Sequence, residues 1–190
     1  MRAFSIFFGV CLFGIAACGG SSSGGGSSSV NGTAAGKSVP TTDTVGFVGT
    51  QTQNVGGGTV TIAYAGVSIT NVANSCGTLQ GHHNPANTAF LSFVVSGLGA
   101  SIAAGTYAIG TSSSTNVVAN YGATNATCGP TASEQATKGS ITFTTVSSTT
   151  VQGTFDLTMD SGDHLTGSFT APVCNVAILN NTGSTPTCGS

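Results

Sequence analysis

The sequence predicts an all-β protein, and three observations lead to that prediction. Only 4% of the residues are charged, so good helix formers for exposed faces are scarce, whereas Thr, Val, Ile, Phe and Tyr suit half-buried pleated surfaces. The segment 59–64 alternates, with Val60, Ile62 and Tyr64 on one face. Turn residues then divide the chain into short segments. These features predict a single antiparallel β-sandwich or small β-barrel of about 8–9 strands.

The expected strands follow one another along one domain, residues 43–190. No stretch shows a convincing helical period, and the segment 131–138, which contains Glu134, is expected to be a surface loop. Such a length suffices for one core. The expected strands are 45–48, 59–64, 67–72, 89–96, 105–109, 116–121, 140–146, 151–159 and 165–173.

The last three strands are expected to form a meander. Gly139, Gly153 and Gly167 recur at a constant spacing, each followed by Ser or Thr, which indicates one strand plus one turn per unit. A three-residue loop at 161–163 would place Met159 opposite Leu165 on the apolar face. The same register would place Asp160 opposite His164 on the polar face.

The N-terminus predicts export. Arg2 precedes an apolar run too short to span a bilayer, so residues 1–17 are expected to be a cleaved signal peptide. The segment Ile15-Ala16-Ala17-Cys18 resembles the lipobox of bacterial lipoproteins. That resemblance implies that the Cys18 thiol receives a diacylglyceryl group, that cleavage occurs before Cys18, and that the new amine is acylated.

Residues 18–42 are rich in Gly and Ser and are expected to form a flexible tether between the lipid and the domain. Several acyl chains would give a firm membrane anchor. The lipoprotein resemblance further implies a bacterial cell-envelope location, and Gly19 after the cysteine favours the outer membrane. After Cys18, Lys37 and Lys138 stand against five carboxylates, a balance that argues against nucleic acid as a partner.

Four cysteines remain in the expected domain, and an even number in an exported protein predicts two disulfides. Three connectivities are possible. We favour Cys174 with Cys188, which closes a short C-terminal loop, and therefore Cys76 with Cys128. A metal site made of four cysteines is disfavoured because no CxxC pair occurs.

The polar connection 77–88, which contains His82 and His83, is the first candidate for a binding site, because binding residues concentrate on loops. Adjacent histidines on an extended chain point to opposite sides, so no metal site is expected from them.

A second candidate is the cluster of Asp160, Asp163 and His164 at the expected hairpin tip. It lacks the ligand pattern of a calcium loop and an identified nucleophile for acid–base chemistry. A solvated turn with a surface ion pair is the simpler interpretation.

No catalytic or cofactor-binding motif was found in the sequence. The leading hypothesis is therefore a non-catalytic envelope lipoprotein, without a cofactor, whose β domain binds an unknown ligand or protein partner or contributes to envelope structure. One alternative is a small hydrolytic or metal-assisted enzyme that uses the Asp and His side chains named above. Another is a self-associating surface or fibre subunit, because the uncharged strands lack lysine protection at their edges.

Overall fold

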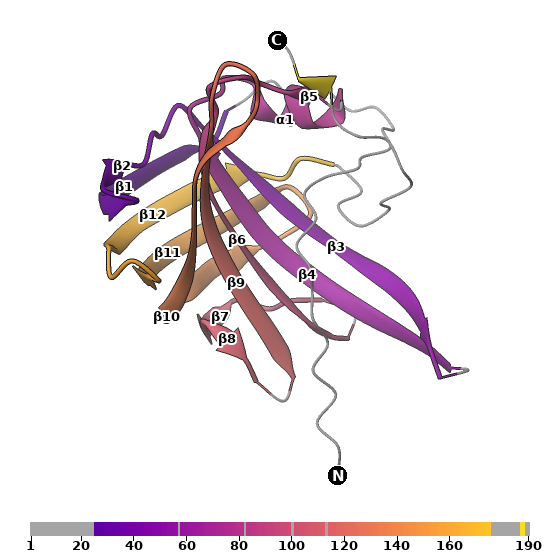
Figure 1. Cartoon of the computed structure of the whole chain (residues 1–190). Coiled ribbons are helices and arrows are strands. Elements are labelled where there is room, and N and C mark those ends of the chain that lie inside the picture. The colour runs from indigo at the N-terminus through magenta and orange to yellow at the C-terminus, as the bar shows by residue number, and fades with distance from the viewer. Residues whose placement is uncertain are drawn as a thin grey trace.

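Strands make up most of the part of the chain that the computed structural model describes, which is residues 25–56, 58–81, 83–99, 101–112, 114–175 and 187–188. They form one antiparallel sheet that curls into a half-barrel (Figure 1), so the all-β prediction is confirmed. The elements are β1 (Ser27–Ala34), β2 (Lys37–Ser38), β3 (Asp43–Val55), β4 (Gly58–Thr70), α1 (Ser75–Gln80), β5 (His83–Asn84), β6 (Ala89–Leu98), β7 (Gly105–Ala108), β8 (Gly110–Thr111), β9 (Thr115–Thr124), β10 (Pro130–Val146), β11 (Thr150–Met159), β12 (His164–Pro172) and β13 (Thr187–Cys188).

The sheet has the order β2-β1-β12-β11-β10-β9-β6-β4-β3, and the long strand β10 lies at its bend. The first part of β10 pairs with β9, and the last part pairs with β11 and β7. A register shift falls between Ala136 and Lys138, and Gly139 follows with a φ of 114°. Bulges of this kind bend a strand, so the two halves of the sheet face each other.

The core lies between these two halves and is rich in phenylalanine. Phe93 of β6 lies with its ring centroid 5.1 Å from that of Phe169 on β12 and 5.7 Å from that of Phe155 on β11. Phe143 of β10 contacts Phe169 edge-on. All four side chains are almost fully buried, so aromatic packing joins the two halves.

The predicted meander is present, and its glycines have a packing reason. A Cβ atom at Gly153 would lie 2.0 Å from the carbonyl oxygen of Thr142 and 2.8 Å from Cζ of Phe169. A Cβ at Gly167 would lie 2.5 Å from Cζ of Phe155. Gly153 and Gly167 each lie directly opposite a phenylalanine of the neighbouring strand, whereas Gly139 lies opposite Leu157. Two of the three regularly spaced glycines therefore leave room for the rings of Phe155 and Phe169.

The predicted register of the last hairpin is wrong by two residues. Leu157, not Met159, lies opposite Leu165, and the Met159 N–H donates to the Asp163 carbonyl at 2.8 Å. The three-residue loop is therefore 160–162, and it ends on Gly162 at a φ of 93°. This loop type needs its left-handed residue last, and glycine takes that position at the least cost.

The predicted tether extends too far, because residues 27–34 and 37–38 are strands. Strand β1 pairs with β12 from Ser27 to Gly32, and Ala34 at its end is fully buried. The folded domain thus begins well before residue 43. Composition favoured a coil, but the free edge of β12 supplies the backbone partners that a Gly/Ser segment cannot supply locally. Residues 18–24 lie outside the described part.

Two further boundaries differ from the prediction. The segments 59–64 and 67–72 fall largely in one strand, β4, because Gly66 between them lets β6 approach closely: a Cβ there would lie 2.5 Å from the Phe93 carbonyl oxygen. The expected loop 131–138 is the first part of β10. In both places residues typical of loops lie within a strand, because pairing with the neighbouring strands outweighs their local preference.

Candidate functional site

A groove lies on the outer face of the sheet, where the connection from β4 to β6 covers strands β4, β6, β9 and β10. One row of directly opposed residues crosses these strands and forms its floor. The row consists of Thr70, Phe90, Gly122 and Ser133. The alternate residues of these strands, such as Leu91 and Tyr121, point into the core. The floor of the groove is therefore the face of the sheet that points away from the core.

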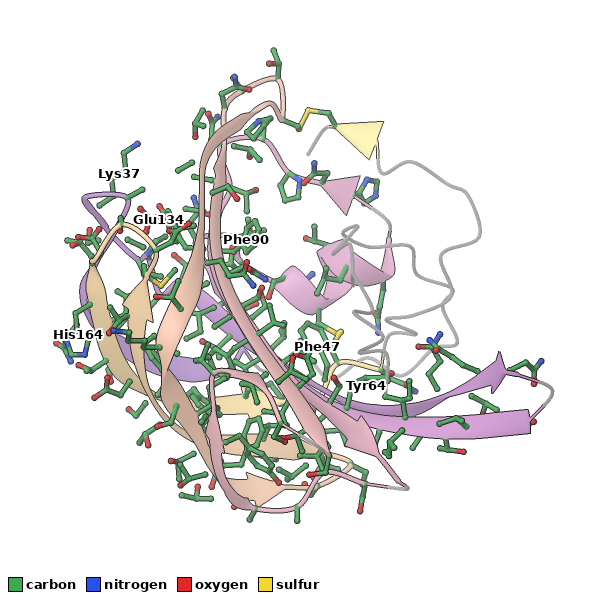
Figure 2. The ribbon with its side chains drawn as sticks, turned by 60° about the horizontal axis from the view of Figure 1, so that its bottom comes forward. Lys37, Phe47, Tyr64, Phe90, Glu134 and His164 are labelled. Carbon is green, nitrogen blue, oxygen red and sulfur yellow. A yellow bond between two sulfur atoms is a disulfide. The ribbon has the colours of Figure 1, made fainter. Side chains whose placement is uncertain are left out.

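Phe90 lies flat on the backbone of the neighbouring strand. A Cβ atom added to Gly122 would lie 2.5, 2.8 and 3.2 Å from Cζ, Cε1 and Cε2 of Phe90. The ring thus occupies the space above Gly122. It is only half-buried, because its other side lines the groove. Figure 2 shows Phe90 on the side of the sheet that faces α1. The residue forms an aromatic platform with one face against the sheet.

The short helix α1 forms one wall of the groove through Ser75, Thr78 and Leu79. Six residues are too few for an independently stable helix, so tertiary contacts must hold it. The buried carboxylate of Asp43 does so: its Oδ2 accepts bonds from the Ser75 N–H and Oγ–H, each at 2.8 Å. This contact fixes the start of α1 to the start of β3.

A disulfide between Cys76 and Cys174 holds the same helix from below, with a Cα–Cα distance of 5.5 Å. Cys174 follows β12 and donates its N–H to the Gly46 carbonyl of β3 at 2.8 Å. A small apolar cluster that includes Phe47 and Leu79 surrounds this disulfide. The wall therefore rests on its own hydrophobic contacts as well as on a covalent link.

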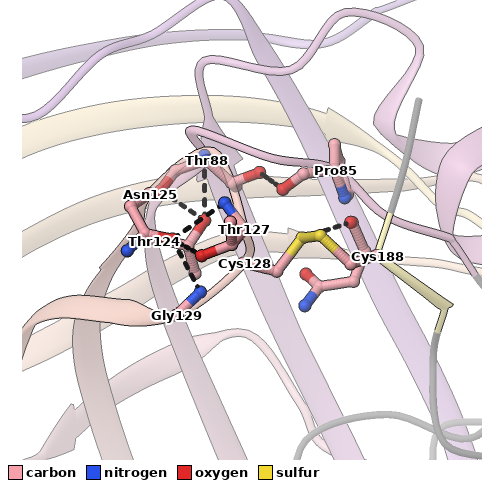
Figure 3. Close-up of a disulfide and its surroundings, with 9 residues drawn as sticks. Pro85, Thr88, Thr124, Asn125, Thr127, Cys128, Gly129 and Cys188 are labelled. Atoms are coloured by element: carbon pink, nitrogen blue, oxygen red, sulfur yellow. Dashed lines mark hydrogen bonds between the residues drawn. A yellow bond between two sulfur atoms is a disulfide. The ribbon is translucent and has the colours of Figure 1, made fainter.

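The opposite wall is held by the second disulfide, Cys128–Cys188 (Figure 3). It joins the turn after β9 to β13, which pairs in parallel with β5. The Asn125 carboxamide oxygen orders the turn by accepting the N–H groups of Thr127 and Gly129, both at 2.9 Å. These links place His83 and Asn84 of β5 at the rim of the groove.

The predicted disulfide pairing, Cys76–Cys128 and Cys174–Cys188, is therefore wrong. Both observed bonds join segments that are distant in the sequence, with separations of 98 and 60 residues. The prediction favoured a short C-terminal loop. The course of the chain instead takes Cys174 beneath α1, while β5 holds Cys188 beside the turn of Cys128.

The groove has a volume of about 290 Å³ and a mainly apolar lining. Among its described lining residues none is Asp, Glu, Lys or Arg, and one is a histidine, His83. Most of the lining hydroxyls already bond within the protein. Those engaged are Thr70, Ser75, Thr78, Thr88 and Thr124.

Of the predicted binding loop, His83 lies at this rim, and His82 lies outside the described residues. The His83 side chain is exposed, and its Cδ2 would be 2.7 Å from a Cβ at Gly81, so the ring lies close against the glycine that ends α1. No described residue forms a hydrogen bond with this ring. A ring nitrogen is therefore open to a ligand.

The predicted cluster of Asp160, Asp163 and His164 does not form. The His164 Nε2 lies 2.9 Å from Oδ1 of Asp156, and both side chains are more than half exposed. Asp163 instead accepts the Gly36 N–H at 2.9 Å. Figure 2 shows His164 on the outer surface of the other half of the sheet. This pair is a solvated surface contact of little energy.

Glu134 and Tyr121 form a polar pair that sequence reasoning missed. They lie opposite each other on β10 and β9, and Tyr121 is almost fully buried. Burial, and secondarily the Glu134 carboxylate, raises the pKa of Tyr121 above its usual value of 10.0. Oε2 of Glu134 is buried without a hydrogen-bond partner in the described part of the chain.

A second hollow, on the outer face of β1, β11 and β12, is wide open and lined by small polar residues. Some of its hydroxyls bond one another, as Ser29 and Ser168 do at 2.9 Å.

Among the described residues no group of three or more His, Cys, Asp or Glu side chains is arranged to bind a metal ion. In the same part of the chain no helix has the length and apolar character to cross a membrane.

No protein-family model matches the sequence, and neither a curated protein nor a solved structure matches the chain. The class of the protein thus follows from its own fold and site. It is a curled all-β protein with an external apolar groove walled by two disulfide-linked segments.

Proposed function

We propose that the protein is a membrane-anchored lipoprotein of the bacterial cell envelope whose β domain binds a small ligand without catalysis. The signal peptide 1–17 would be removed, and Cys18 would carry the lipid anchor, in the outer membrane. The lipobox resemblance of Ile15-Ala16-Ala17-Cys18 supports this part of the proposal. The disulfides agree with an exported protein.

The apolar groove is the observation that supports ligand binding. Binding sites for small molecules are typically concave, mostly apolar and equipped with a few polar groups. The groove beside Phe90 has these properties, and two walls held by disulfides give it a preformed shape. Of the side chains proposed for an enzyme, Asp160, Asp163 and His164 lie at the hairpin between β11 and β12 and are not brought together, whereas His83 lies at the rim of the groove.

A native mass spectrum of the full-length protein, extracted in mild detergent from its own membranes, tests the ligand. We expect a small molecule to copurify with the wild type. Gly122→Ala should lose it, because the new Cβ displaces the Phe90 ring into the groove. Thr154→Ala, exposed on the other half of the sheet, is the matched control and should retain it. Equal occupancy in all three proteins would contradict the assignment of the groove.

The anchor has a separate test. The intact mass of the wild type should exceed that of the polypeptide 18–190 by a diacylglyceryl and an acyl group, and the protein should partition into the detergent phase. Cys18→Ser should abolish both properties. An unacylated wild type would contradict the lipoprotein part of the proposal and leave the groove assignment intact.

A further inference from the structure

We propose that the groove takes an uncharged molecule with a flat apolar ring system of about two fused rings and a single hydrogen-bonding group. The ring system would lie on Phe90, and the polar group would contact His83. This inference rests on the proposed ligand-binding function and specifies the chemistry of the ligand. Four properties of the groove support it.

The first property is the orientation of Phe90. Its ring lies against the Gly122 backbone, where three ring carbons occupy the space of the missing Cβ. A ring held flat in this way offers a planar face to the groove rather than an edge. Planar apolar ligands gain from offset stacking on such a face, beyond the area that they bury.

The second property is the absence of charge among the described lining residues. Asp43, whose carboxylate holds the α1 wall, is buried and already accepts bonds from Ser75 and Thr44. A charged ligand would lose its hydration and find no opposite charge in the groove. The groove therefore favours neutral molecules.

The third property is the small number of open polar groups. The hydroxyls of Thr70, Thr88 and Thr124 are engaged in bonds within the protein. A sugar carries a hydroxyl on most of its carbons and would leave them unpaired here, at a cost for each. Among the described lining residues the polar groups that stay open are few: the hydroxyls of Ser68 and Ser133, the Asn84 side chain and the exposed His83 ring. Among these we assign the His83 ring, at the rim, to the polar group of the ligand.

The fourth property is size. The groove measures about 290 Å³, and an apolar protein cavity of about 150 Å³ accommodates benzene. The groove thus offers room for about two fused six-membered rings. The walls that set this limit are α1 on one side and β5 on the other.

The test uses the full-length protein in mild detergent with five named probes: 2-naphthol, naphthalene, 2-naphthoate, 1-octanol and maltose. Equilibrium dialysis gives the free concentration of each probe. Changes in the NMR chemical shifts of the backbone amides of Gly122 and Ala132 show whether the probe binds at the groove. We expect saturable 2-naphthol binding at the groove. Binding of 2-naphthoate should be about tenfold weaker or less, because its charge is desolvated without a partner, and maltose should not bind.

Two variants test the contacts. Phe90→Leu keeps an apolar floor and should weaken 2-naphthol about three- to tenfold, the size of one aromatic contact, while 1-octanol is unaffected. His83→Ala should weaken 2-naphthol but not naphthalene, and His164→Ala, exposed on the other half of the sheet, should change neither. Thermal melting of each variant checks that the fold is kept.

The outcomes separate this inference from the proposed function. If 1-octanol or maltose shifts the groove amides while 2-naphthol does not, ligands bind there but the ring inference is wrong. Equal binding of 2-naphthoate and 2-naphthol overturns the neutral class. If no probe shifts these amides and no small molecule copurifies, both proposals fail.

Discussion

Replacing the buried Asp43 by Asn tests whether a single carboxylate holds the wall of the groove. Asp43 is only 4% exposed. Its Oδ2 accepts the Ser75 N–H and Oγ–H, and its Oδ1 accepts the Thr44 N–H, all at 2.8 Å. Asn keeps the shape of the side chain but has one acceptor oxygen in place of two. At least one of these donors therefore loses its partner.

The expected cost follows from these bonds. A hydrogen bond to a charged group contributes about 1.5–3 kcal/mol, and one between neutral groups about 0.5–1.5 kcal/mol. Asp43→Asn loses one charged bond and converts the other two into neutral ones, while it removes the cost of a buried charge. We expect the free energy of unfolding to fall by about 2–4 kcal/mol. Ser75→Ala, which removes only the hydroxyl bond, should cost less.

Urea unfolding of the full-length protein, followed by circular dichroism, measures this change. Asp160→Asn is the matched control, because Asp160 is exposed at a hairpin tip, and it should leave stability within about 0.5 kcal/mol. Amide hydrogen exchange of α1 should rise in Asp43→Asn before the sheet is affected. If Asp43→Asn is as stable as Asp160→Asn, the helix does not depend on the carboxylate and the reasoning is refuted.

Three further predictions concern the disulfide, the core and a buried phenol. Replacing Cys128 and Cys188 together by Ser removes a link that closes a 60-residue separation and should cost about 4 kcal/mol; an unchanged melting temperature would contradict this. Gly153→Ala should destabilise by about 3 kcal/mol or more, since its Cβ would meet a backbone oxygen at 2.0 Å, whereas Gly129→Ala should stay within about 1 kcal/mol. Because the pKa of Tyr121 is raised in the folded state, stability should fall as the pH rises above about 10, and Tyr121→Phe should remove that fall. An ultraviolet titration in which all tyrosines ionise together at their usual pKa would refute the last point.

The sheet could be predicted because its signals are local. Strand β11 alternates between the buried residues Val151, Phe155 and Leu157 and the outward residues Thr154 and Asp156, and period-2 alternation of this kind identifies both the strand and its inner face. The register of the hairpin to β12 depends on which loop residue takes the left-handed conformation. Glycine could take more than one position there, so the register was missed.

The groove could not be predicted, because each of its parts depends on a partner far along the chain. Phe90 is a platform only because β9 presents Gly122 opposite it. Asp43 caps α1 from a strand that begins 32 residues earlier than Ser75. The sequence contains one signal for this region, the position of His83 in the polar connection 77–88. That signal correctly identified the rim of the groove as a candidate, but not its floor or its walls.

The packing of the core explains why a binding site would lie outside the half-barrel. Phe93, Phe143, Phe155 and Phe169 contact one another between the two halves of the sheet, so a ligand that entered there would have to displace tightly packed rings. A groove on the outer face needs only a cover, and the connection from β4 to β6 provides it. That cover has little core of its own, which accounts for the position of both disulfides beside it. In the protein with both disulfides reduced, ligand binding should therefore be lost at a lower denaturant concentration than the one that unfolds the sheet. The reason is that the cover depends on the covalent links far more than the strands do.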